Sequence, residues 1–394
     1  MAPRGRTSDL LIVGAGVMGC SAAFHLAGRG LRVTVLEKGA IGAGSTGRSS
    51  AIIRQHYSNR LTIRMALHSL RVFQEFDERV GGECGFRSTG WVGLVAAEDE
   101  AGLMANLALQ RSLGVEARLL EPEELDELFP GLEMGDAVAA AYEPRSGHAD
   151  PHLTVHAYAE AARRRGATIL LDAEVTGLRF AGGRIQGVET REGTFQAPIV
   201  VNCAGPWSAR VSRSAGVDLP VTSCRAQVAC FRRPATLGVE HPVVIDFVNG
   251  TYFRSETGGL TLVGSIDPSE GRAVVDPDDF PEHVDGSFVA AAGERLLRRL
   301  PPMERGHSTG GYAGLYAVTP DWHPIVDEVP PESGCFVCAG FSGHGYKLAP
   351  AVGRMVADLV TGASDPEFDP HLFRFARFAE EEPVRGRYAY SITG

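Results

Sequence analysis

The sequence predicts an α/β nucleotide-binding fold that is interrupted by a largely antiparallel β domain. Three features of the 394-residue chain predict this class. A β-α-β pattern with three spaced glycines occupies residues 9–37, a second strand, glycine turn and helix occupy 333–362, and short strand-like segments fill most of 221–309. The length suggests about two domains, because a single core stops growing at roughly 250–300 residues.

The first glycine loop has the full context of a dinucleotide site. The apolar strand at 9–13 runs into Gly14, Gly16 and Gly19, and a helix and a second strand then end at Glu37. In this motif Gly14 permits the tight turn, Gly16 lets a pyrophosphate approach the backbone, and Gly19 lets the helix pack on the strand. Glu37 is placed to accept hydrogen bonds from a ribose diol. We therefore expect a bound dinucleotide.

The next segment favours FAD over NAD. Residues 42–57, "GAGSTGRSSAIIRQHY", are small, polar and rich in glycine, where an NAD-binding domain would continue with a helix and a strand. A loop with many hydroxyls and backbone amides can follow a long polar ligand. The alternative is a flexible surface loop.

The middle of the chain alternates between helices and strands. In order, the expected elements are a strand at 90–97, helices at 98–114, 121–129 and 151–165, strands with a Gly182-Gly183 hairpin in 167–190, a strand from 197 into a glycine turn, and a helix near 287–300. We expect the FAD-binding domain to comprise 1–80, 145–220 and 310–394, and the substrate domain to comprise 81–144 and 221–309.

The second glycine loop suits the other end of FAD. The strand-like segment from 333 enters "GFSGHG" (340–345), and an apolar helix follows up to Gly362. A helix N-terminus offers free amides and a partial positive charge, which suits the flavin edge that becomes electron-rich on reduction. NAD folds need no such loop, although an ordinary strand, turn and helix is the alternative.

Composition excludes other classes of function. The net charge of −10 disfavours a nucleic-acid partner, and no apolar run reaches the roughly 18 residues of a membrane span. The apolar run after Arg4 and Arg6 is too short for a signal peptide, so we expect a cytoplasmic enzyme. Seven scattered cysteines do not make a disulfide framework, and one CxxC, Cys335 and Cys338, cannot supply four zinc ligands. We expect no metal site.

Lysine is almost absent from the chain. Of 38 basic residues other than histidine, only Lys38 and Lys347 are lysine, which leaves 36 arginines. A merely solvated positive charge would therefore nearly always be arginine here. Because the two groups are not interchangeable, Lys347 in the second loop indicates a position that requires a compact ammonium.

Five segments together resemble the FAD-dependent amino-acid oxidoreductases of the D-amino-acid oxidase and sarcosine oxidase superfamily, most of all the β subunits of sarcosine oxidase and proline dehydrogenase. They are "IVGAGVMG" (12–19), "GSTGRSSAIIRQ" (44–55), "NCAGPWS" (202–208), "AGLYAVTPDWHPIVD" (313–327) and "AGFSGHGYKLAPAVGRMVADLVTG" (339–362). The resemblance implies a discontinuous FAD-binding domain with an antiparallel substrate domain over the flavin.

The resemblance and the glycine loops together assign the FAD contacts. The expected cofactor-binding residues are Gly14, Ala15, Gly16, Val17, Met18, Gly19, Glu37, Lys38, Gly44, Ser45, Thr46, Arg48, Ser49, Ser50, Val175, Cys203, Ala204, Gly205, Trp207, Gly314, Gly343, His344, Gly345, Tyr346 and Lys347. Gly314 stands where monomeric sarcosine oxidases carry the cysteine that attaches FAD, so we expect non-covalent FAD. The mid-chain lysine that activates oxygen in sarcosine oxidases is missing. The histidine that carries a second flavin in heterotetrameric sarcosine oxidases is replaced near Asp150, so we do not expect a second flavin.

The expected reaction is hydride transfer from the carbon next to an amino-acid nitrogen to flavin N5. The resemblance implies that Arg54 and Lys347 bind the substrate carboxylate and that Tyr316 lies near the substrate. Tyr252 and Arg254, in the strand "GTYFRS", could also face the pocket. Arg54 could instead be a solvated loop arginine, and Lys347 a solvated lysine in the first turn of the helix. For Tyr252 and Arg254 the alternative is the ordinary alternation of side chains along a strand.

Three functions remain open from the sequence. The first is oxidation of a small amino acid, either a secondary amine such as sarcosine or proline or a D-amino acid, with O2 or another electron acceptor. The second is an FAD enzyme acting on a hydroxy acid or glycerol phosphate. The third is a flavoprotein subunit within a larger complex or homo-oligomer.

Overall fold

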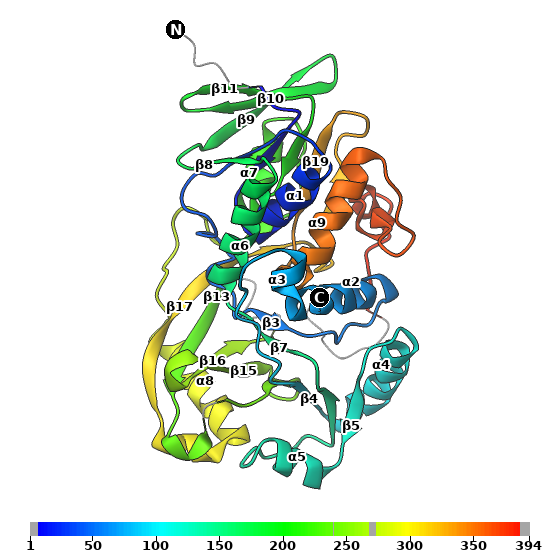
Figure 1. The fold of residues 1–394 in the computed structure, drawn as a ribbon. Helices are drawn as coiled ribbons and strands as arrows, with labels where there is room; N and C mark the ends of the chain where they lie inside the picture. The colour runs from blue at the N-terminus through cyan, green and yellow to red at the C-terminus, as the bar shows by residue number, and fades with distance from the viewer. Residues whose placement is uncertain (1–6, 239, 268–272, 387–394) are drawn as a thin grey trace.

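Two large β-sheets organise the chain in the computed structural model, which describes residues 7–238, 240–267 and 273–386 (Figure 1). Arg4 and Arg6 lie outside these residues. The upper, six-stranded sheet has the order β18 (Ile325–Glu328), β19 (Cys335–Ala339), β12 (Val200–Asn202), β1 (Leu10–Val13), β2 (Val33–Leu36) and β8 (Thr168–Leu170). All neighbours pair in parallel except β18 with β19. The predicted β-α-β unit is confirmed as β1, α1 (Val17–Gly28) and β2.

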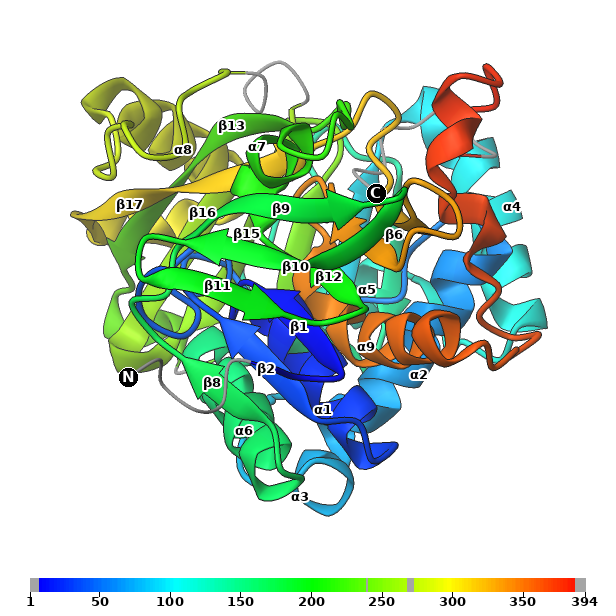
Figure 2. The ribbon, with the colours of Figure 1, turned by 90° about the horizontal axis from the view of Figure 1, so that it is seen from above.

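The six-stranded sheet lies between a layer of helices and a second, smaller sheet. Successive residues of its strands point to opposite faces and so pack against one or the other of these layers. Leu10 and Ile12 pack into the core that contains α1, α6 (Pro151–Arg164) and α9 (Gly345–Thr361). Leu11 and Val13 pack instead beneath a three-stranded sheet. That sheet has the order β11 (Gly193–Gln196), β10 (Arg184–Thr190) and β9 (Val175–Ala181), and it lies over the six-stranded sheet in Figure 2.

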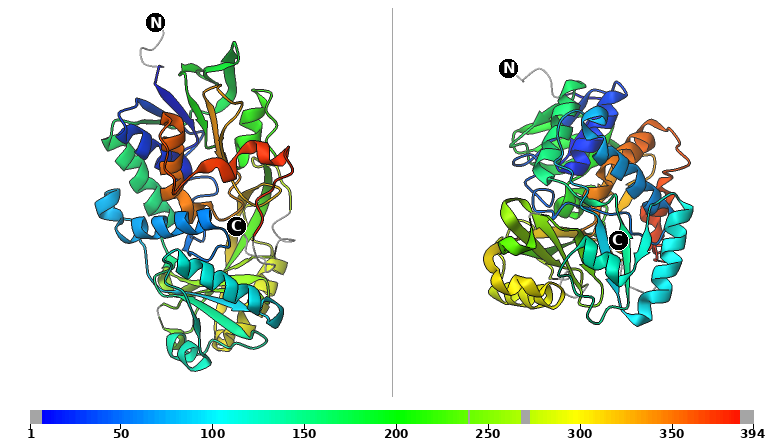
Figure 3. Two further views of the ribbon diagram at one scale, coloured as in Figure 1. Left: turned by 90° about the vertical axis from the view of Figure 1, so that its right-hand side faces the viewer. Right: turned by 60° about the horizontal axis from the view of Figure 1, so that its bottom comes forward.

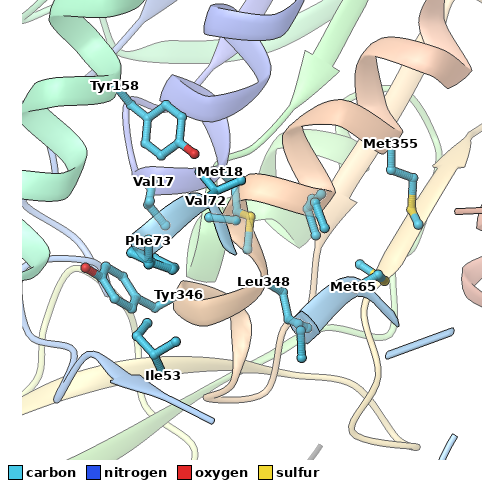
Figure 4. Packing of buried hydrophobic residues seen from close by; sticks show 14 of the residues in the cluster. Val17, Met18, Ile53, Met65, Val72, Phe73, Tyr158, Tyr346, Leu348 and Met355 are labelled. Carbon is cyan, nitrogen blue, oxygen red and sulfur yellow. The ribbon is translucent and has the colours of Figure 1, made fainter. Parts of the chain in front are cut away.

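Close packing of α1 against α9 brings the two glycine loops together. These helices lie side by side in both views of Figure 3. Ser21 on α1 donates a hydrogen bond of 2.8 Å to the Ala349 carbonyl, and a methyl group added at Gly353 would lie 2.1 Å from the Ser21 Oγ. Figure 4 shows Tyr346 of α9 beside Ile53 and Leu348 farther along the same core, toward Met65. The N-terminus of α9 is thereby fixed close to that of α1.

The lower sheet has eight strands. Its order is β17 (His307–Val318), β13 (Thr222–Arg232), β16 (Leu260–Ser265), β15 (Thr251–Glu256), β14 (Val243–Asp246), β4 (Trp91–Val95), β6 (Ala139–Glu143) and β5 (Arg118–Leu120). All pairs are antiparallel except β14 with β4. Val244, Phe253 and Val263 pack on one face against α8 (Gly286–Arg299). The predicted fold class is thus confirmed.

The predicted division into domains cuts one strand. The expected boundary at residue 310 lies inside β17, which pairs along β13 within the eight-stranded sheet. Both long strands also contact the turn at 205–207, which follows β12 of the upper sheet. The proposed domains are therefore joined through β13 and β17 as well as through the interdomain connections of the chain.

The sequence analysis did not identify helix α2 (Arg60–Gln74), which packs against α9. Asn59 caps it by accepting a hydrogen bond of 2.8 Å from the Thr62 amide. The remaining elements are α3 (Phe76–Arg79), α4 (Glu100–Ser112), α5 (Pro122–Leu128), α7 (Ser208–Arg213) and the paired short strands β3 (Ile52–Ile53) and β7 (Gly147–His148). Residues 51–58 are buried, so the second half of the 42–57 segment is not a surface loop, whereas residues 43–50 are exposed or half-buried.

Candidate active site

Four separate segments meet at one edge of the six-stranded sheet. Because β1, β2, β12 and β19 are parallel, their carboxyl ends share this edge, where α/β proteins bind ligands. The segments that follow these strands are the first glycine loop, Glu37 and Lys38, residues 203–207 and residues 340–345. They line a cavity of about 640 Å³, which we call the dinucleotide cavity.

The first glycine loop is shaped by close backbone contacts. Gly14 has a φ of +99°, and a methyl group added there would lie 2.7 Å from the Cys203 carbonyl oxygen. At Gly19 it would lie 2.0 Å from the Gly14 carbonyl oxygen. Thr46 Oγ1 accepts a hydrogen bond of 3.0 Å from the Val17 amide. Only glycine leaves the loop this close to its neighbours, as the motif predicts.

The Glu37 carboxylate is fixed at the tip of β2. One oxygen accepts a hydrogen bond of 2.7 Å from the Ala15 amide, and the other accepts one of 2.8 Å from the Gly39 amide. Glu37 also lines the dinucleotide cavity. A carboxylate can accept further bonds, so these contacts leave it suited to a ribose diol.

A cluster of charged side chains forms the rim of this cavity. Lys38 Nζ lies 2.6 Å from Asp278 and 3.7 Å from the centre of the Trp207 ring. Asp278 also accepts hydrogen bonds from Trp207, at 2.7 Å, and from Arg210. Lys38 was expected to bind FAD directly, but its ammonium is engaged in this rim cluster. Asp278 carried no sequence signal because it lies in no motif.

Most residues expected to bind the cofactor line the dinucleotide cavity. They are Gly14, Gly16, Val17, Met18, Glu37, Lys38, Gly44, Ser45, Thr46, Arg48, Ser49, Ser50, Val175, Cys203, Ala204, Gly205, Trp207, Gly314, Gly343, Gly345 and Tyr346. Ala15 and Gly19 do not line the cavity and instead support its wall. His344 and Lys347 line a second cavity. The sequence analysis missed Pro277, Asp278, Phe280 and Glu282, which reach the first cavity from the segment before α8.

The dinucleotide cavity fits FAD, and its chemistry agrees with non-covalent binding. It is lined by one glycine loop at the start of α1 and by another at the start of α9. Gly314 has no side chain, and an added methyl group would lie 2.9 Å from the Arg48 Cβ. Among the described residues, Cys203 is the one cysteine that lines this cavity. A hydrogen bond with Cys338, together with burial, raises its pKa well above the usual value, so it is a poor nucleophile.

A second cavity of about 470 Å³ adjoins the first. We call it the substrate cavity. The two cavities share the wall residues Ser49, Ser50, Ala226, Tyr252, Tyr316, Ser342, Gly343 and Tyr346. Arg54, His344 and Lys347 line only the substrate cavity, together with apolar side chains such as Ile245 and Phe288. Two basic residues, Arg54 and Lys347, and one acidic residue, Asp267, therefore line a partly apolar space beside the candidate cofactor site.

Arg54 is buried at the start of an internal polar network, with 5% of its surface exposed. Its guanidinium donates a hydrogen bond to the His56 carbonyl and lies 4.5 Å from the centre of the Tyr57 ring. Glu143, fully buried, accepts hydrogen bonds from the Gln55 amide at 2.8 Å and from the Ser146 hydroxyl at 2.6 Å. Burial raises the pKa of Glu143, while these hydrogen bonds and the Arg54 charge oppose the rise. Arg54 is thus not a solvated loop residue.

Lys347 is buried in the first turn of α9, with 7% of its surface exposed. Burial, and then the nearby positive charge of Arg54, hold its pKa well below the usual value. The solvated lysine considered in the sequence analysis is therefore wrong.

His344 immediately precedes α9 and has 2% of its surface exposed. Burial is the main cause that lowers its pKa well below the usual value, so the ring is neutral. Its Nε2 lies 2.9 Å from the Trp322 carbonyl oxygen. Nε2 must therefore carry the proton and donate to that oxygen, and the buried Nδ1 is left as an acceptor with no partner among the described residues.

The structure separates the two tyrosines from Arg254. Tyr252 and Tyr316 line both cavities, and the Tyr252 hydroxyl lies 3.1 Å from the Ser50 Oγ. Burial raises the pKa of both phenols, which keeps them neutral. Arg254 is not among the residues that line either cavity. It donates a hydrogen bond of 2.5 Å to the Ser50 carbonyl and pairs with Glu256 at 2.7 Å, so it supports the cavity wall from behind.

Comparison with known proteins agrees with this arrangement. Human mitochondrial sarcosine dehydrogenase is 29% identical over 95% of this chain, and the chain spans 42% of that protein, less than half its length. Sarcosine oxidase subunit beta from Rhodobacter capsulatus is 26% identical over 96% of this chain and 91% of that protein. The crystal structure of L-proline dehydrogenase from P. horikoshii superposes with a TM-score of 0.88 and 29% identity, covering 96% of this chain and 99% of that one.

The expected cytoplasmic location stays a prediction, because some of the similar proteins are mitochondrial. Among the described helices, none has the length and apolar character needed to cross a membrane. A match to the family described as FAD dependent oxidoreductase (DAO) extends over residues 9–359, from the start of β1 into α9. The chain therefore belongs to the DAO family of FAD-dependent oxidoreductases.

Proposed function

We propose that the protein oxidises the C–N bond of a small amino acid to an imine. The substrate is a secondary amine such as sarcosine, another N-methyl amino acid or proline, or else a D-amino acid. The observation that carries this proposal is the pair of buried basic residues, Arg54 and Lys347, on the wall of the substrate cavity. The names of the sarcosine and proline enzymes that the chain resembles support the same substrate class.

Arg54 is suited to bind the substrate carboxylate. Its guanidinium is held in place by the His56 carbonyl and the Tyr57 ring, so less freedom is lost when it binds a ligand. A planar guanidinium can grip a carboxylate through two parallel hydrogen bonds, which fixes the orientation of the ligand. Each hydrogen bond to a charged group contributes about 1.5–3 kcal/mol, and burial favours the upper part of that range.

The shared wall supports contact between substrate and cofactor. Tyr252, Tyr316 and Gly343 belong to both cavities, so ligands in the two cavities would meet beside them. When bound, FAD supplies a two-electron acceptor that takes a hydride from the carbon next to nitrogen. The protein contributes alignment, because a clamped carboxylate leaves few orientations for that carbon.

The match to a sarcosine oxidase subunit beta supports a role as one subunit of a larger enzyme, and this remains part of the proposal. The rival arrangement is a homo-oligomer that is active alone. Size in solution and the activity of the isolated chain decide between them. Admission of air to the reduced enzyme shows whether the electron acceptor is O2 or another oxidant.

The proposed function is tested by bleaching of the flavin under anaerobic conditions. The panel of candidate substrates contains sarcosine, N,N-dimethylglycine, glycine, both proline enantiomers and D-alanine. Glycolate, lactate and glycerol 3-phosphate are tested separately as substrates of the alternative function. We expect an amino acid to bleach the flavin, and admission of air then shows whether O2 restores the colour. Bleaching by a hydroxy acid or by glycerol phosphate alone would overturn the proposal.

A further inference from the structure

Lys347 differs from the three most deeply buried arginines in having no anionic partner in the described part of the chain. Arg254, Arg299 and Arg377 are each at least 98% buried, and each pairs with an aspartate or glutamate. Within the described part of the chain, no hydrogen bond or ion pair reaches the Lys347 Nζ. A buried charge without a partner is costly, so the nitrogen is more stable here as a neutral amine.

The groups around Lys347 reinforce this state. Arg54 presents a second positive charge, from the segment after β3. His344 lies one turn before Lys347 and is neutral, with His323 at 6.0 Å between ring centres. Tyr316, from β17, lines the same cavity as a neutral phenol. The Arg54 charge acts to lower the pKa of the buried carboxyl of Glu143, and Asp267, after β16, is the acidic residue that lines the cavity in the described part of the chain.

We propose that Lys347 is a neutral amine in the ligand-free holoenzyme and accepts the proton of the substrate ammonium group. This inference rests on the proposed amino-acid substrate, which arrives with a carboxylate and an ammonium. One N–H bond of the ammonium breaks, and the proton forms a new N–H bond on Lys347 Nζ. No electrons leave either molecule in this step.

The proton transfer prepares the substrate in two ways. It frees the nitrogen lone pair, without which a hydride cannot leave the neighbouring carbon. It also turns Lys347 into a cation beside the carboxylate that Arg54 binds. The carboxylate thus places an anion beside Lys347, and this favours protonation of Lys347 after binding.

The charge state can be measured directly, because the chain has only two lysines. Holoenzyme labelled with ¹³C and ¹⁵N at lysine should give two side-chain signals. Lys38, partly exposed and paired with Asp278, is the internal reference. We expect Lys347, at a pH below the usual lysine pKa of about 10.4, to give the signal of a neutral amine and Lys38 to give the signal of an ammonium. Lys347→Met assigns the signals, or Lys38→Arg if the first variant loses FAD. Two ammonium signals would overturn the proposal.

The role in proton transfer is tested by the pH dependence of anaerobic flavin reduction, given as rate over affinity. In the wild type this quantity should level off above the Lys347 pKa. In Lys347→Met it should keep rising about tenfold per pH unit toward the pKa of the substrate amine, because only the free amine then reacts. Profiles of the same shape would overturn the transfer. A neutral Lys347 in an enzyme that no amino acid reduces would overturn the transfer and the proposed function, but not the neutral state.

Discussion

The dinucleotide cavity and the substrate cavity share a wall but differ in how they treat charge. In the first, the charged side chains Lys38, Arg48 and Arg210 lie on the rim, and each is paired with an acidic residue. In the second, Arg54 and Lys347 are buried, and Lys347 has no acidic partner in the described structure. Under the proposed function, the first cavity would bind its ligand largely through backbone shape, whereas the second would pair its buried basic residues with the negative charge of its ligand.

The same difference orders the expected effects of substitution. A binding site formed by close backbone contacts is disrupted when a single methyl group is added, because no rearrangement of side chains can relieve the contact. When the charge of a buried cation is removed, the binding free energy of its ligand falls by about the energy of one charged hydrogen bond. A paired charge on an exposed rim contributes least, because water and salt replace it.

The largest effect is expected for Gly19→Ala. The added methyl group would lie 2.0 Å from the Gly14 carbonyl oxygen, so the loop and α1 must separate. We expect the free energy of unfolding to fall by about 3 kcal/mol and FAD to be lost on purification. Thermal unfolding and the flavin content per protein measure both. The control is Gly286→Ala, where an added methyl meets nothing within 4 Å. Equal flavin content in the two variants would show that the loop is not shaped by this contact.

Arg54→Met should come next, and it should act on the substrate cavity alone. Loss of a buried charged contact to the substrate carboxylate costs about 2–3 kcal/mol, which is roughly 30- to 150-fold in flavin reduction rate over affinity. FAD content should not change, because Arg54 does not line the dinucleotide cavity. Arg118→Met removes a charge from an exposed pair with Glu124 and serves as the control. Stopped-flow reduction that stays within threefold of the wild type would reject Arg54 as the carboxylate ligand.

Glu37→Gln should have a smaller effect, confined to the dinucleotide cavity. The amide keeps one acceptor oxygen but turns a donor toward the Ala15 or Gly39 amide that the carboxylate now binds. We expect FAD to bind about tenfold more weakly, or about 1.5 kcal/mol, with little change in reduction rate once FAD is bound. Fluorescence titration of the apoprotein measures this affinity, and Glu160→Gln, at an exposed position of α6, is the control. An unchanged affinity would remove Glu37 from the ribose site.

The comparison also explains what the sequence could and could not predict. The first cavity follows from local patterns, because glycine spacing and strand ends specify its backbone; the loops at 14–19 and 340–345 lie as expected. The substrate cavity depends on pairing between distant strands, which local patterns do not specify. Strand alternation placed Tyr252 and Arg254 on one face of β15, but only the structure shows that the guanidinium turns to Ser50 and Glu256. The Asp278 rim was missed for the same reason.

That rim gives the last and smallest prediction. Burial acts to raise the pKa of Asp278, but hydrogen bonds from Lys38, Trp207 and Arg210 outweigh it and lower the pKa to about 2. The cluster therefore persists above the ordinary aspartate pKa and is lost only as the pH falls toward 2, so FAD release should not vary with this group between about pH 5 and 9. Exposed ion pairs contribute about 0–1 kcal/mol.

Asp278→Asn should accordingly speed FAD release by no more than about fivefold at low salt. Added salt should speed release from the wild type and narrow the difference, because it screens the same pairs. Stopped-flow flavin fluorescence measures the release rate, with Asp218→Asn, an exposed charge near Arg213, as the control. An increase in the rate of FAD release that exceeds the tenfold effect expected for Glu37→Gln, or that does not change with salt, would contradict this comparison of the two cavities. It would mean that the rim, and not the backbone of the glycine loops, holds the dinucleotide, and that both cavities depend on charged side chains.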